Sequence, residues 1–545
     1  MTPSRSLTGA RAVFLFGLLL GRSVFAAAPE VRGTWLTTTG TEDHIRSGAN
    51  TEAVFADLRN IGLNTAYVET WKAGYTNFPS PTLQSLTGRD RAPYLGASRD
   101  LVRETVIQAH RNQMHYVGWF EYGFAAEFVG SGGQPFSPLG REARDRGWLL
   151  EDQGGQFANS SNGFAWMNPA VPEVRQLLVD ITLEAVDRYD LDGVQFDDRL
   201  SWPREFGWDD TTAAIYLDET GRSLPQSVDD PHFRAWRQSK VTQFARQWSD
   251  AVRGARPELL VSVSPSITAF SDINFNAEWP EWQDEGLFDE YVVQAYRSSD
   301  AAFDSILPGQ LAPFGTDQRG ELVLGLRANG SGAATPYAEL EQMIVTSRDV
   351  GAAGHSIFYS RGVRDLYGDG LAAFYDVENQ GHAANPLFTA PRRAPVVADA
   401  AGQNAWLVDV AAAGAYKLVA EVGGVWRELS AGYFPEGERE LTVFNATRVE
   451  LLEDRRAIEP ADFNGDGLVN AADYSVWRDT FASVTDLRAD ANGDGFVNAL
   501  DYDLWSAGYG YLISQAVSVP EPMSLAVAGL AVACRVAAPA RRRRA

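Results

Sequence analysis

Cysteine is nearly absent from this chain of 545 residues, whose only thiol is Cys534. A single cysteine excludes an intrachain disulfide and a cysteine-based zinc site. Cys534 lies in an apolar C-terminal tail, which argues against thiol catalysis. Histidine is scarce as well. None of the histidines shows metal-ligand spacing, so we interpret all of them as structural (His44, His110, His115, His232, His355 and His382).

Positive charge is also in short supply. The chain has 47 lysine and arginine residues against 71 aspartate and glutamate residues, which gives a formal net charge of -24 and a pI of about 4.7. This balance argues against a nucleic acid or another polyanion as a partner bound through general electrostatics. We interpret the acidic excess as a solubilising surface.

Long hydrophobic runs are few. Near the N-terminus, "AVFLFGLLL" follows basic residues (Arg5 and Arg11) and precedes the small residues of "SVFAAA". This order is typical of a secretory signal peptide, and the apolar run is too short to span a bilayer comfortably. We therefore predict a signal peptide over residues 1–28, with cleavage near Ala26, and an exported mature protein.

Apolar β-branched runs alternate with amphipathic stretches from about residue 31 to residue 360. This alternation is typical of βα units and a parallel sheet. We expect strands at "VRGTWLT", "NTAYVET", "HYVGWFEY", "GVQFDD", "LLVSVSPS", "YVVQAY", "LVLGLRA" and "HSIFYSR". Helical patterns lie between them, such as "TEAVFADLRNIG", "LVRETVIQAHRNQ", "PEVRQLLVDITLEAVDRYD" and "FRAWRQSKVTQFARQWSDAVRG".

About eight such units predict an α/β fold, a (β/α)8 TIM-type barrel at residues 29–390. The rival fold is an open doubly wound sheet. Such a sheet usually carries a Gly-rich phosphate loop after its first strand, and "WLTTTGTED" is not one.

The helical periodicity ends after Pro391. Residues 395–455 contain short strand-like runs, namely "AWLVDV", "AYKLVAEV", "RELTVFN" and "TRVELLE". The simplest interpretation is a small β-sandwich domain at residues 391–456. Such a domain could bind sugar, but we favour a domain that only packs on the barrel.

An internal repeat follows, in which "DFNGDGLVNAAD" (462–473) recurs as "DANGDGFVNALD" (490–501). Each copy supplies oxygen ligands at loop positions 1, 3, 5, 9 and 12 and a glycine at position 6, which is the logic of an EF-hand with Asp as the final ligand. The carbonyls of Leu468 and Phe496 would fill position 7. The side-chain ligands would be Asp462, Asn464, Asp466, Asn470 and Asp473 in the first loop and Asp490, Asn492, Asp494, Asn498 and Asp501 in the second. We predict structural Ca²⁺ in a module at residues 457–512, and no cofactor for catalysis.

Two adjacent acids, Asp197 and Asp198, end the fourth expected strand. Catalytic groups of (β/α)8 barrels lie at the C-terminal ends of strands. With alternating side chains, Gln195, Asp197 and Arg199 share the face toward the barrel mouth, while Asp198 points to the wall or the next loop. We expect Asp197 to be the nucleophile or charge stabiliser and Asp198 to hold the local network. Arg199 would keep Asp197 ionised.

Two other strand ends offer a partner acid, because Glu69 closes "TAYVET" and Glu121 lies in "GWFEYGF". Aromatic faces beside paired carboxylates suit a sugar, whose ring stacks while the acids handle protons and the oxocarbenium charge. Structural roles remain open, since a strand-end acid also caps helices or pairs with arginine, and a tryptophan also fills a core. The candidate substrate-binding residues are Trp35, Trp71, Trp119, Tyr122, Arg199, Trp202, Tyr296, Arg297, Asn329, Tyr359 and Arg361.

Three resemblances cover most of the chain. "EVRGTWLTT", "GWFEYGF", "MNPAVPEVRQLLVDITLEAVDRYDLDGVQFDDR", "EFGWDD" and "VVQAYR" resemble the glycosyl hydrolase-like family ten over about residues 30–365. The resemblance implies a barrel that acts on glycosidic bonds of a polysaccharide; some relatives cleave peptidoglycan glycan strands stripped of peptide. "DGVQFDD" also resembles the DGxDxDxE strand of chitinase-like barrels. Here, however, Gln195 replaces the first inner acid and Arg199 the proton donor, so the donor must come from another strand.

The repeat resembles a type I dockerin, which implies a cohesin-like domain as a partner. Residues 517–545, with "VPEP", an apolar stretch and terminal arginines, resemble a PEP-CTERM sorting signal with a short transmembrane segment. This resemblance implies a tail that is recognised at the inner membrane and cut near the motif. The protein would then be exported to the cell surface or beyond, anchored to the membrane only transiently. A permanent anchor is the alternative.

These features predict a secreted endo-glycosidase. The alternative is a catalytically inactive carbohydrate-binding or scaffold-docking surface protein, which would lack a second carboxylate within about 10 Å of Asp197. A deacetylase is disfavoured because no metal-ligand cluster surrounds the strand ends.

Overall fold

The computed structural model describes residues 27–509 except 39–44, 46, 97, 331, 413, 435, 457–460, 465–468 and 492–495. The expected sorting signal and residues 1–26 of the expected signal peptide therefore lie outside the described residues. Within the described part of the chain, no helix is long and apolar enough to cross a membrane.

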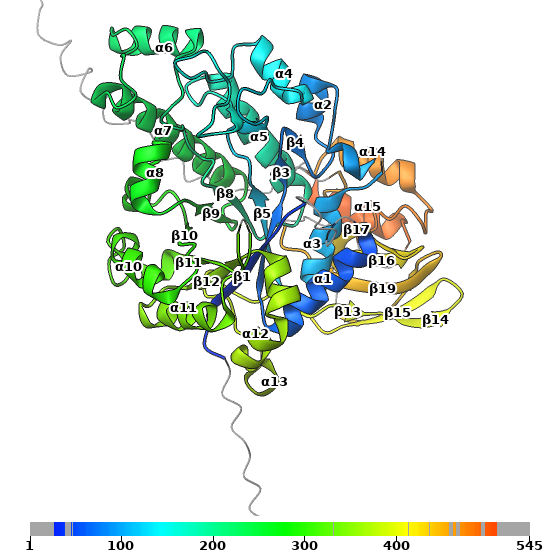
Figure 1. The fold of residues 1–545 in the computed structure, drawn as a ribbon. Coiled ribbons are helices and arrows are strands. Elements are labelled where there is room, and N and C mark those ends of the chain that lie inside the picture. Colours follow the sequence, from blue (N-terminus) through cyan, green and yellow to red (C-terminus); the bar gives the residue numbers. More distant parts are fainter. Residues whose placement is uncertain are drawn as a thin grey trace, which may run out of the picture.

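Eight parallel strands close into a barrel in the order β1-β12-β11-β10-β9-β8-β5-β2 (Figure 1). They coincide with the eight strands expected from the sequence, and the closure excludes the open doubly wound sheet. Their bounds are β1 (Val31–Leu36), β2 (Thr65–Glu69), β5 (His115–Phe120), β8 (Gly193–Asp197), β9 (Leu260–Ser264), β10 (Glu290–Gln294), β11 (Leu322–Arg327) and β12 (Gly354–Phe358).

Helices surround this barrel (Figure 1). In α5 (Pro172–Arg188), Pro172 starts the helix, and Val174, Leu178 and Ile181 are fully buried. The apolar spacing of three and four residues places them on one face, as expected. The other helices of this region are α1 (Gly48–Ile61), α2 (Pro81–Thr87), α3 (Leu101–Arg111), α4 (Pro138–Asp145), α6 (Asp210–Thr220), α7 (Pro231–Ala255), α8 (Thr268–Phe275), α9 (Trp279–Asp284), α10 (Asp300–Leu311), α11 (Tyr337–Asp349), α12 (Gly368–Tyr375) and α13 (Val377–Gln380), with short turns η1 (Pro93–Leu95), η2 (Arg319–Glu321) and η3 (Gly362–Leu366).

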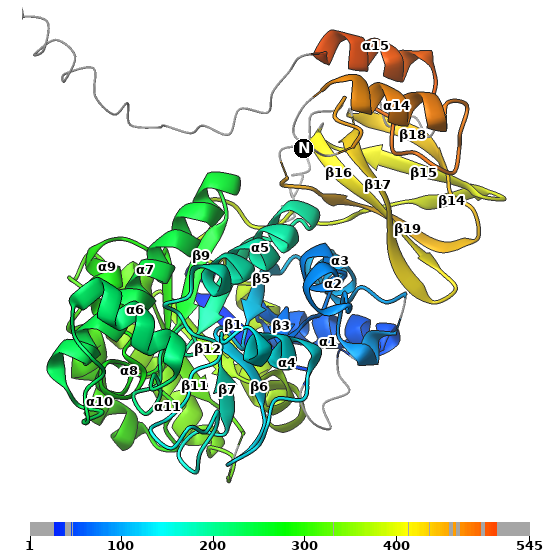
Figure 2. The same cartoon turned by 90° about the horizontal axis from the view of Figure 1, so that it is seen from above.

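Two small hairpins extend the loops that follow barrel strands. They are formed by β3 (Trp71–Lys72) with β4 (Tyr75–Thr76), and by β6 (Ala125–Phe128) with β7 (Phe164–Trp166). Figure 2 shows β6 and β7 on the side of the barrel away from the C-terminal strands. These loops build one wall of the site described below.

A polar layer crosses the inside of the barrel below its mouth. The buried carboxyl of Glu290 accepts hydrogen bonds from Tyr67 Oη at 2.7 Å and Ser262 Oγ at 2.6 Å. Gln195 Nε2 donates to Ser262 Oγ at 2.9 Å, and Trp35 Nε1 donates to Gln195 Oε1 at 2.8 Å. Burial raises the pKa of Glu290 to about 7. Because every member has a partner, the layer fixes the strands beneath Asp197.

The C-terminal strands form two antiparallel sheets, in the orders β13-β19-β16-β17 and β14-β15-β18 (Figure 2). Their bounds are β13 (Val396–Val397), β14 (Asp399–Gly402), β15 (Ala405–Val410), β16 (Gly414–Val422), β17 (Val425–Phe434), β18 (Gly437–Thr442) and β19 (Ala446–Glu453). The two sheets share one apolar core that includes Trp406, Leu418 and Leu451. This arrangement matches the β-sandwich expected from the sequence; the exact domain boundaries stay predictions.

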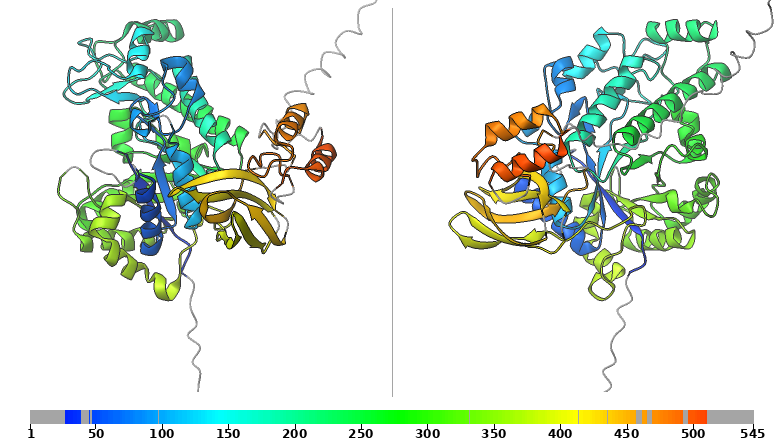
Figure 3. Two further views of the ribbon diagram at one scale, coloured as in Figure 1. Left: turned by 90° about the vertical axis from the view of Figure 1, so that its right-hand side faces the viewer. Right: turned by 180° about the vertical axis from the view of Figure 1, so that it is seen from behind.

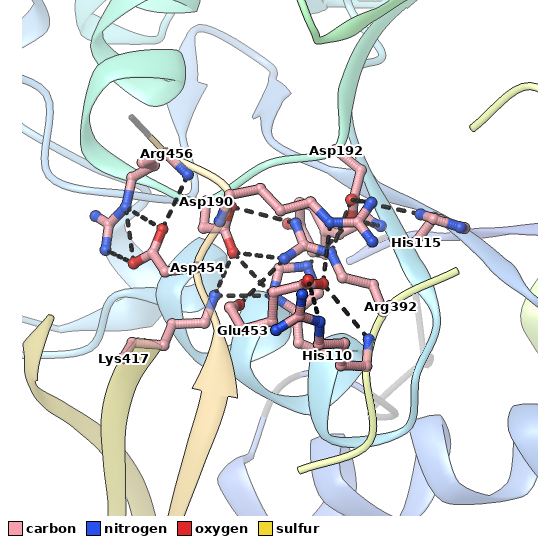
Figure 4. Close-up of polar contacts among 12 residues, drawn as sticks. His110, His115, Asp190, Asp192, Arg392, Lys417, Glu453, Asp454 and Arg456 are labelled. Atoms are coloured by element: carbon pink, nitrogen blue, oxygen red, sulfur yellow. Dashed lines mark hydrogen bonds and ion pairs between the residues drawn. The ribbon is translucent and has the colours of Figure 1, made fainter. Parts of the chain in front are cut away.

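The sandwich packs against α3 of the barrel (Figure 3). A buried ionic cluster joins the two parts (Figure 4). Lys417 of β16 donates from Nζ to Nδ1 of His110 and to Oδ2 of Asp190, each at 2.8 Å. Arg392 contacts Oδ2 of Asp190 and Oδ1 of Asp192, each at 2.8 Å. Desolvation and the two cations lower the pKa of His110 to about 3, so its ring is neutral and can accept from Lys417.

The repeat contributes two helices, α14 (Ala471–Thr480) and α15 (Ala499–Gly508). Apolar residues beside its loops, including Phe463, Leu487 and Val497, belong to the same core cluster as the sandwich residues. The carbonyl oxygen of Asp490 lies 3.4 Å from the position that a Cβ on Gly432 of β17 would take. The repeat therefore packs on the sandwich instead of hanging from it as an independent module.

Candidate active site

Three acids meet at the mouth of the barrel because each stands where a strand ends. Glu69 is the last residue of β2, Glu121 follows β5 directly, and Asp197 is the last residue of β8. In the barrel β2 pairs with β5, and β5 pairs with β8. Parallel neighbours end at the same edge, so the three carboxyl groups lie side by side.

Two cations alternate with these acids. Lys72 Nζ lies 2.6 Å from Oε2 of Glu69 and 3.1 Å from Oε2 of Glu121. Arg199 Nη1 lies 3.8 Å from Oε1 of Glu121 and 2.9 Å from Oδ2 of Asp197. Oε1 of Glu121 and Oδ2 of Asp197 are therefore no farther apart than the sum of those last two distances. That upper limit lies within the roughly 5 to 9.5 Å that separates paired glycosidase carboxyl groups.

Glu69 is fully buried and saturated with donors. Its carboxylate accepts from the hydroxyls of Thr37 and Thr38, from the backbone nitrogen of Thr38, and from Lys72. Lys72 and these hydrogen bonds outweigh burial, so the pKa of Glu69 lies below its usual value. A carboxylate held ionised by so many donors suits positioning better than proton donation.

Glu121 has the opposite environment. Its Oε2 is buried and has no hydrogen bond within the described residues, although Lys72 stands nearby. Burial and the neighbouring Glu69 raise the pKa of Glu121 to about 7. A carboxyl group with such a pKa holds a proton near neutrality and can give it away, which is the property of a general acid.

Asp197 is buried, and burial raises its pKa well above the usual range despite the contact with Arg199. The expectation that Arg199 alone keeps Asp197 ionised is therefore too simple. Four acids, including Asp198, share only two cations here, so the cluster retains a proton. Asp197 accepts two N–H groups of Arg199, whereas Oε2 of Glu121 accepts none among the described residues, which favours the proton on Glu121.

Asp198 lies near both the loop after β9 and Arg199, whose Nη1 is 3.9 Å from Oδ1 of Asp198. Its Oδ2 accepts from Ser266 Oγ at 3.0 Å, in the loop after β9. Burial is the main reason why the pKa of Tyr296 is raised, and the negative charges of Asp198 and Asp197 raise it further. Asp198 thus links the loops around the mouth.

Several of the predicted aromatic residues gather here. Trp35 lies with its ring centroid 6.4 Å from those of Trp119 and Tyr296, and Trp119 Nε1 is buried with no partner among the described residues. The guanidinium of Arg199 stacks between Tyr122 and Phe164, 5.2 and 4.9 Å from their centroids. The unpartnered indole N–H is a donor available to a ligand.

Other predicted substrate-binding residues have different surroundings. Trp71 and Trp202 are fully buried, and their indole nitrogens donate to the carbonyls of Gly123 and Phe206. Neither offers a ring face to a ligand in this structure. Arg297 donates to the carbonyl of Tyr296, the side chain of Asn329 accepts from the backbone of Tyr359, and the exposed Arg361 pairs with Asp365 at 3.6 Å. Their part in binding stays a prediction.

A pocket of about 640 Å³ opens beside the acids. Asp198 and Arg199 line it, together with residues of the β6–β7 hairpin and α8. The lining residues are Ser161, Asn162, Gly163, Phe164, Trp166, Asp198, Arg199, Arg204, Glu205, Val228, Phe270, Asn274 and Phe275.

Sequence reasoning missed Lys72, although a signal was present. The chain has only three lysines, and Lys72 stands three residues after a strand-end acid. It also missed the pocket walls, because Phe164 and Phe275 belong to the short elements β7 and α8, which carry no recognisable sequence pattern.

Residues 30–318 match the sequence profile of the family described as Glycosyl hydrolase-like 10. The match covers more than half of the chain. The chain belongs to the glycosyl hydrolase-like 10 family. This family assignment agrees with the strand-end acids and supports a glycoside hydrolase type of function.

The curated relatives that this chain matches share little sequence identity with it. The protein named Glycosyl hydrolase YngK, from Bacillus subtilis (strain 168), is 22% identical over 275 residues, which cover 46% of this chain and 49% of the relative. The protein named Glycosyl hydrolase DigH, from Escherichia coli O6:H1, is 24% identical over 270 residues, which cover 44% and 56%. The chain thus spans about half the length of the curated relatives it matches. Among solved structures, the PgaB (BpsB) glycoside hydrolase domain from Bordetella bronchiseptica has a TM-score of 0.47 at 13% identity, covering 64% of this chain and 98% of that one.

Residues 460–505 match the dockerin type I domain, a module that typically binds Ca²⁺ and a cohesin. The described residues fit the calcium role. Asp473 and Asp501, at loop position 12, are fully buried, and both accept backbone N–H groups of their own loops. Trp477 donates to the carbonyl of Asn498, and Trp505 donates to that of Asn470, which ties each loop to the other helix. Residues 465–468 and 492–495, with four predicted ligands (Asp466, Leu468, Asn492 and Asp494), lie outside the description; no cluster of three acidic, histidine or cysteine ligands is found in the rest.

Proposed function

We propose that this protein is a glycoside hydrolase that cleaves O-glycosidic bonds in a polysaccharide, with Asp197 as nucleophile and Glu121 as general acid and base. The observation that carries the proposal is the single guanidinium nitrogen of Arg199 that approaches both carboxyl groups. Paired glycosidase carboxyl groups lie roughly 5 to 9.5 Å apart, and the retaining mechanism, which we propose here, uses the short end of that range. Family membership supports the same class of reaction.

In the first step, Glu121 gives its proton to the glycosidic oxygen while Asp197 attacks the anomeric carbon. The bond to the leaving sugar breaks, and a glycosyl ester forms on Asp197. In the second step, ionised Glu121 takes a proton from water, which attacks the anomeric carbon and releases Asp197. Lys72 and Arg199 stabilise the carboxylates that appear at each stage.

Binding without catalysis is the other function that the sequence leaves open. That function would be favoured if no second acid lay near Asp197. Glu121 lies beside the same Arg199 nitrogen as Asp197, which argues against it. The proposed setting is extracellular: export by the signal peptide, a calcium-loaded repeat, and docking onto a cohesin-like domain. Peptidoglycan glycan strands and exopolysaccharides are the proposed substrates.

The test is a panel of purified glycans incubated with the full chain, with new reducing ends as the readout. Wild type should release reducing ends from at least one glycan, and Asp197→Asn should not. Asp210→Asn, at an exposed position on α6, is the matched control and should behave as wild type. Circular dichroism of each variant separates lost chemistry from lost folding. Full activity in a folded Asp197→Asn variant would overturn the assignment.

A further inference from the structure

Five phenylalanine and tryptophan rings form a continuous row beside the acid cluster. Successive ring centroids are 5.1 Å apart for Phe128 and Phe164, 6.2 Å for Phe164 and Trp166, 6.3 Å for Trp166 and Phe275, and 5.1 Å for Phe275 and Phe270. The row runs from the β6–β7 hairpin to α8. These elements are far apart in the sequence, and the fold brings their rings together.

Both ends of this aromatic row are open to solvent. Phe128 is 56% exposed and Phe270 is 44% exposed, whereas Trp166 in the middle is 2% exposed. Exposed phenylalanines cost solubility and add nothing to a core, so two of them at the ends of one row suggest a binding role. Four rings of the row, all except Phe128, line the pocket, and the same pocket is lined by Asp198 and Arg199.

The charges in the pocket indicate what kind of ligand fits. Each guanidinium is paired with a carboxylate, Arg199 with Asp197 at 2.9 Å and Arg204 with Asp229 at 2.6 Å. Asp198 and Glu205 add two more acids to the lining. The pocket therefore carries no surplus positive charge for an acidic polymer.

We propose that the aromatic row is a binding track for the sugar units that flank the cleaved bond, and that its ligand is an uncharged polysaccharide chain. Of the substrates proposed above, this favours an exopolysaccharide over peptidoglycan glycan strands, whose muramic acid units carry carboxylates when the peptide is removed. Pyranose rings present apolar faces that stack on aromatic side chains. The position of the track beside a cleaved bond rests on the proposed function, whereas the binding of a polysaccharide to the track does not.

The test measures binding without turnover. The full chain with Glu121→Gln runs in native gels that contain hydroxyethyl cellulose, glycol chitin, dextran or, as the acidic comparator, alginate. At least one uncharged polymer should retard it. Adding Phe270→Ala to the Glu121→Gln protein should weaken its apparent affinity for that polymer about tenfold, which is the typical contribution of one stacked ring. Adding Phe444→Ala is the matched control, because Phe444 is 42% exposed on the sandwich, away from the track.

Equal retardation of the Phe270→Ala and Phe444→Ala proteins would overturn the track. So would retardation by alginate alone, or by none of the polymers. If wild type binds through Phe270 and releases no reducing ends, the track stands and the proposed hydrolysis fails. If wild type cuts the polymer and Phe270→Ala lowers kcat/KM equally for long and short chains, the hydrolysis stands and the track fails.

Discussion

The carboxylate of Asp197 accepts two N–H groups of Arg199, one from the backbone and one from Nη1, each at 2.9 Å. Both residues belong to one turn at the end of β8, so the acid is held by its own chain segment. The same Nη1 reaches toward Glu121. One arginine nitrogen thereby lies between the two proposed catalytic acids.

Glu121→Gln should lower kcat by about 10²- to 10⁴-fold, the usual contribution of a general acid. The loss should be larger for substrates with poor leaving groups, because they need the proton most. The folded pKa of Glu121 is raised to about 7, so the acid is protonated below pH 7 and activity should fall as the pH rises above it. Profiles of kcat/KM against pH check this.

Glu173→Gln, at an exposed position on α5, is the control and should leave the profile unchanged. An alkaline limb that survives intact in the Glu121→Gln protein would show that another group donates the proton.

Lys72→Met should move the alkaline limb to higher pH. The positive charge of Lys72 lowers the pKa of Glu121, so its loss raises that pKa. The change also leaves Glu69 buried without its cation, which should cost about 3–5 kcal/mol of unfolding free energy. Chemical denaturation and the pH profile measure the two effects.

Lys240→Met is a matched control, because Lys240 pairs with the partly exposed Glu219 on the surface. It should cost no more than about 1 kcal/mol. Equal costs for the two lysine variants would contradict the role given to Lys72.

The eight strands and their terminal acids could be predicted because they follow from local patterns: β-branched runs, and polar residues where those runs stop. Lys72 could be noticed as a rare lysine close to a strand-end acid, but its role between two acids could not be predicted, since that role depends on β2 and β5 lying side by side. The burial of Trp71 and Trp202 could not be predicted either. Tryptophan is a residue type that often stacks on sugars, but both side chains are fully buried in the fold. Glu290 and Lys417 were missed because buried charges are recognisable only through distant partners.

Lys417→Met should detach the sandwich from the barrel. Its ammonium joins His110 and Asp190, and both are buried. Leaving Asp190 with less countercharge should cost about 3–5 kcal/mol. Limited proteolysis should then cut the linker near residues 390–395 faster than in wild type. A variant as resistant as wild type would show that the apolar contacts alone hold the interface.

Calcium should raise the thermal midpoint of the sandwich together with the repeat, because they share one core. The barrel transition should stay unchanged. Differential scanning calorimetry of the full chain in chelator and in CaCl₂ separates the two. Asp473→Asn should weaken the shift, while Asp479→Asn, at an exposed ion pair with Arg478, should not. A shift confined to the repeat would contradict the shared core.

The central claim is that Asp197 and Glu121 act together as nucleophile and acid on a glycosidic bond. Proton NMR of the first sugar product, recorded before mutarotation on a glycan that the panel selects, tests it most directly. The account predicts a product with the anomeric configuration of the substrate, and no product from Asp197→Asn. A first product of inverted configuration, or no cleavage of any glycan, would contradict it.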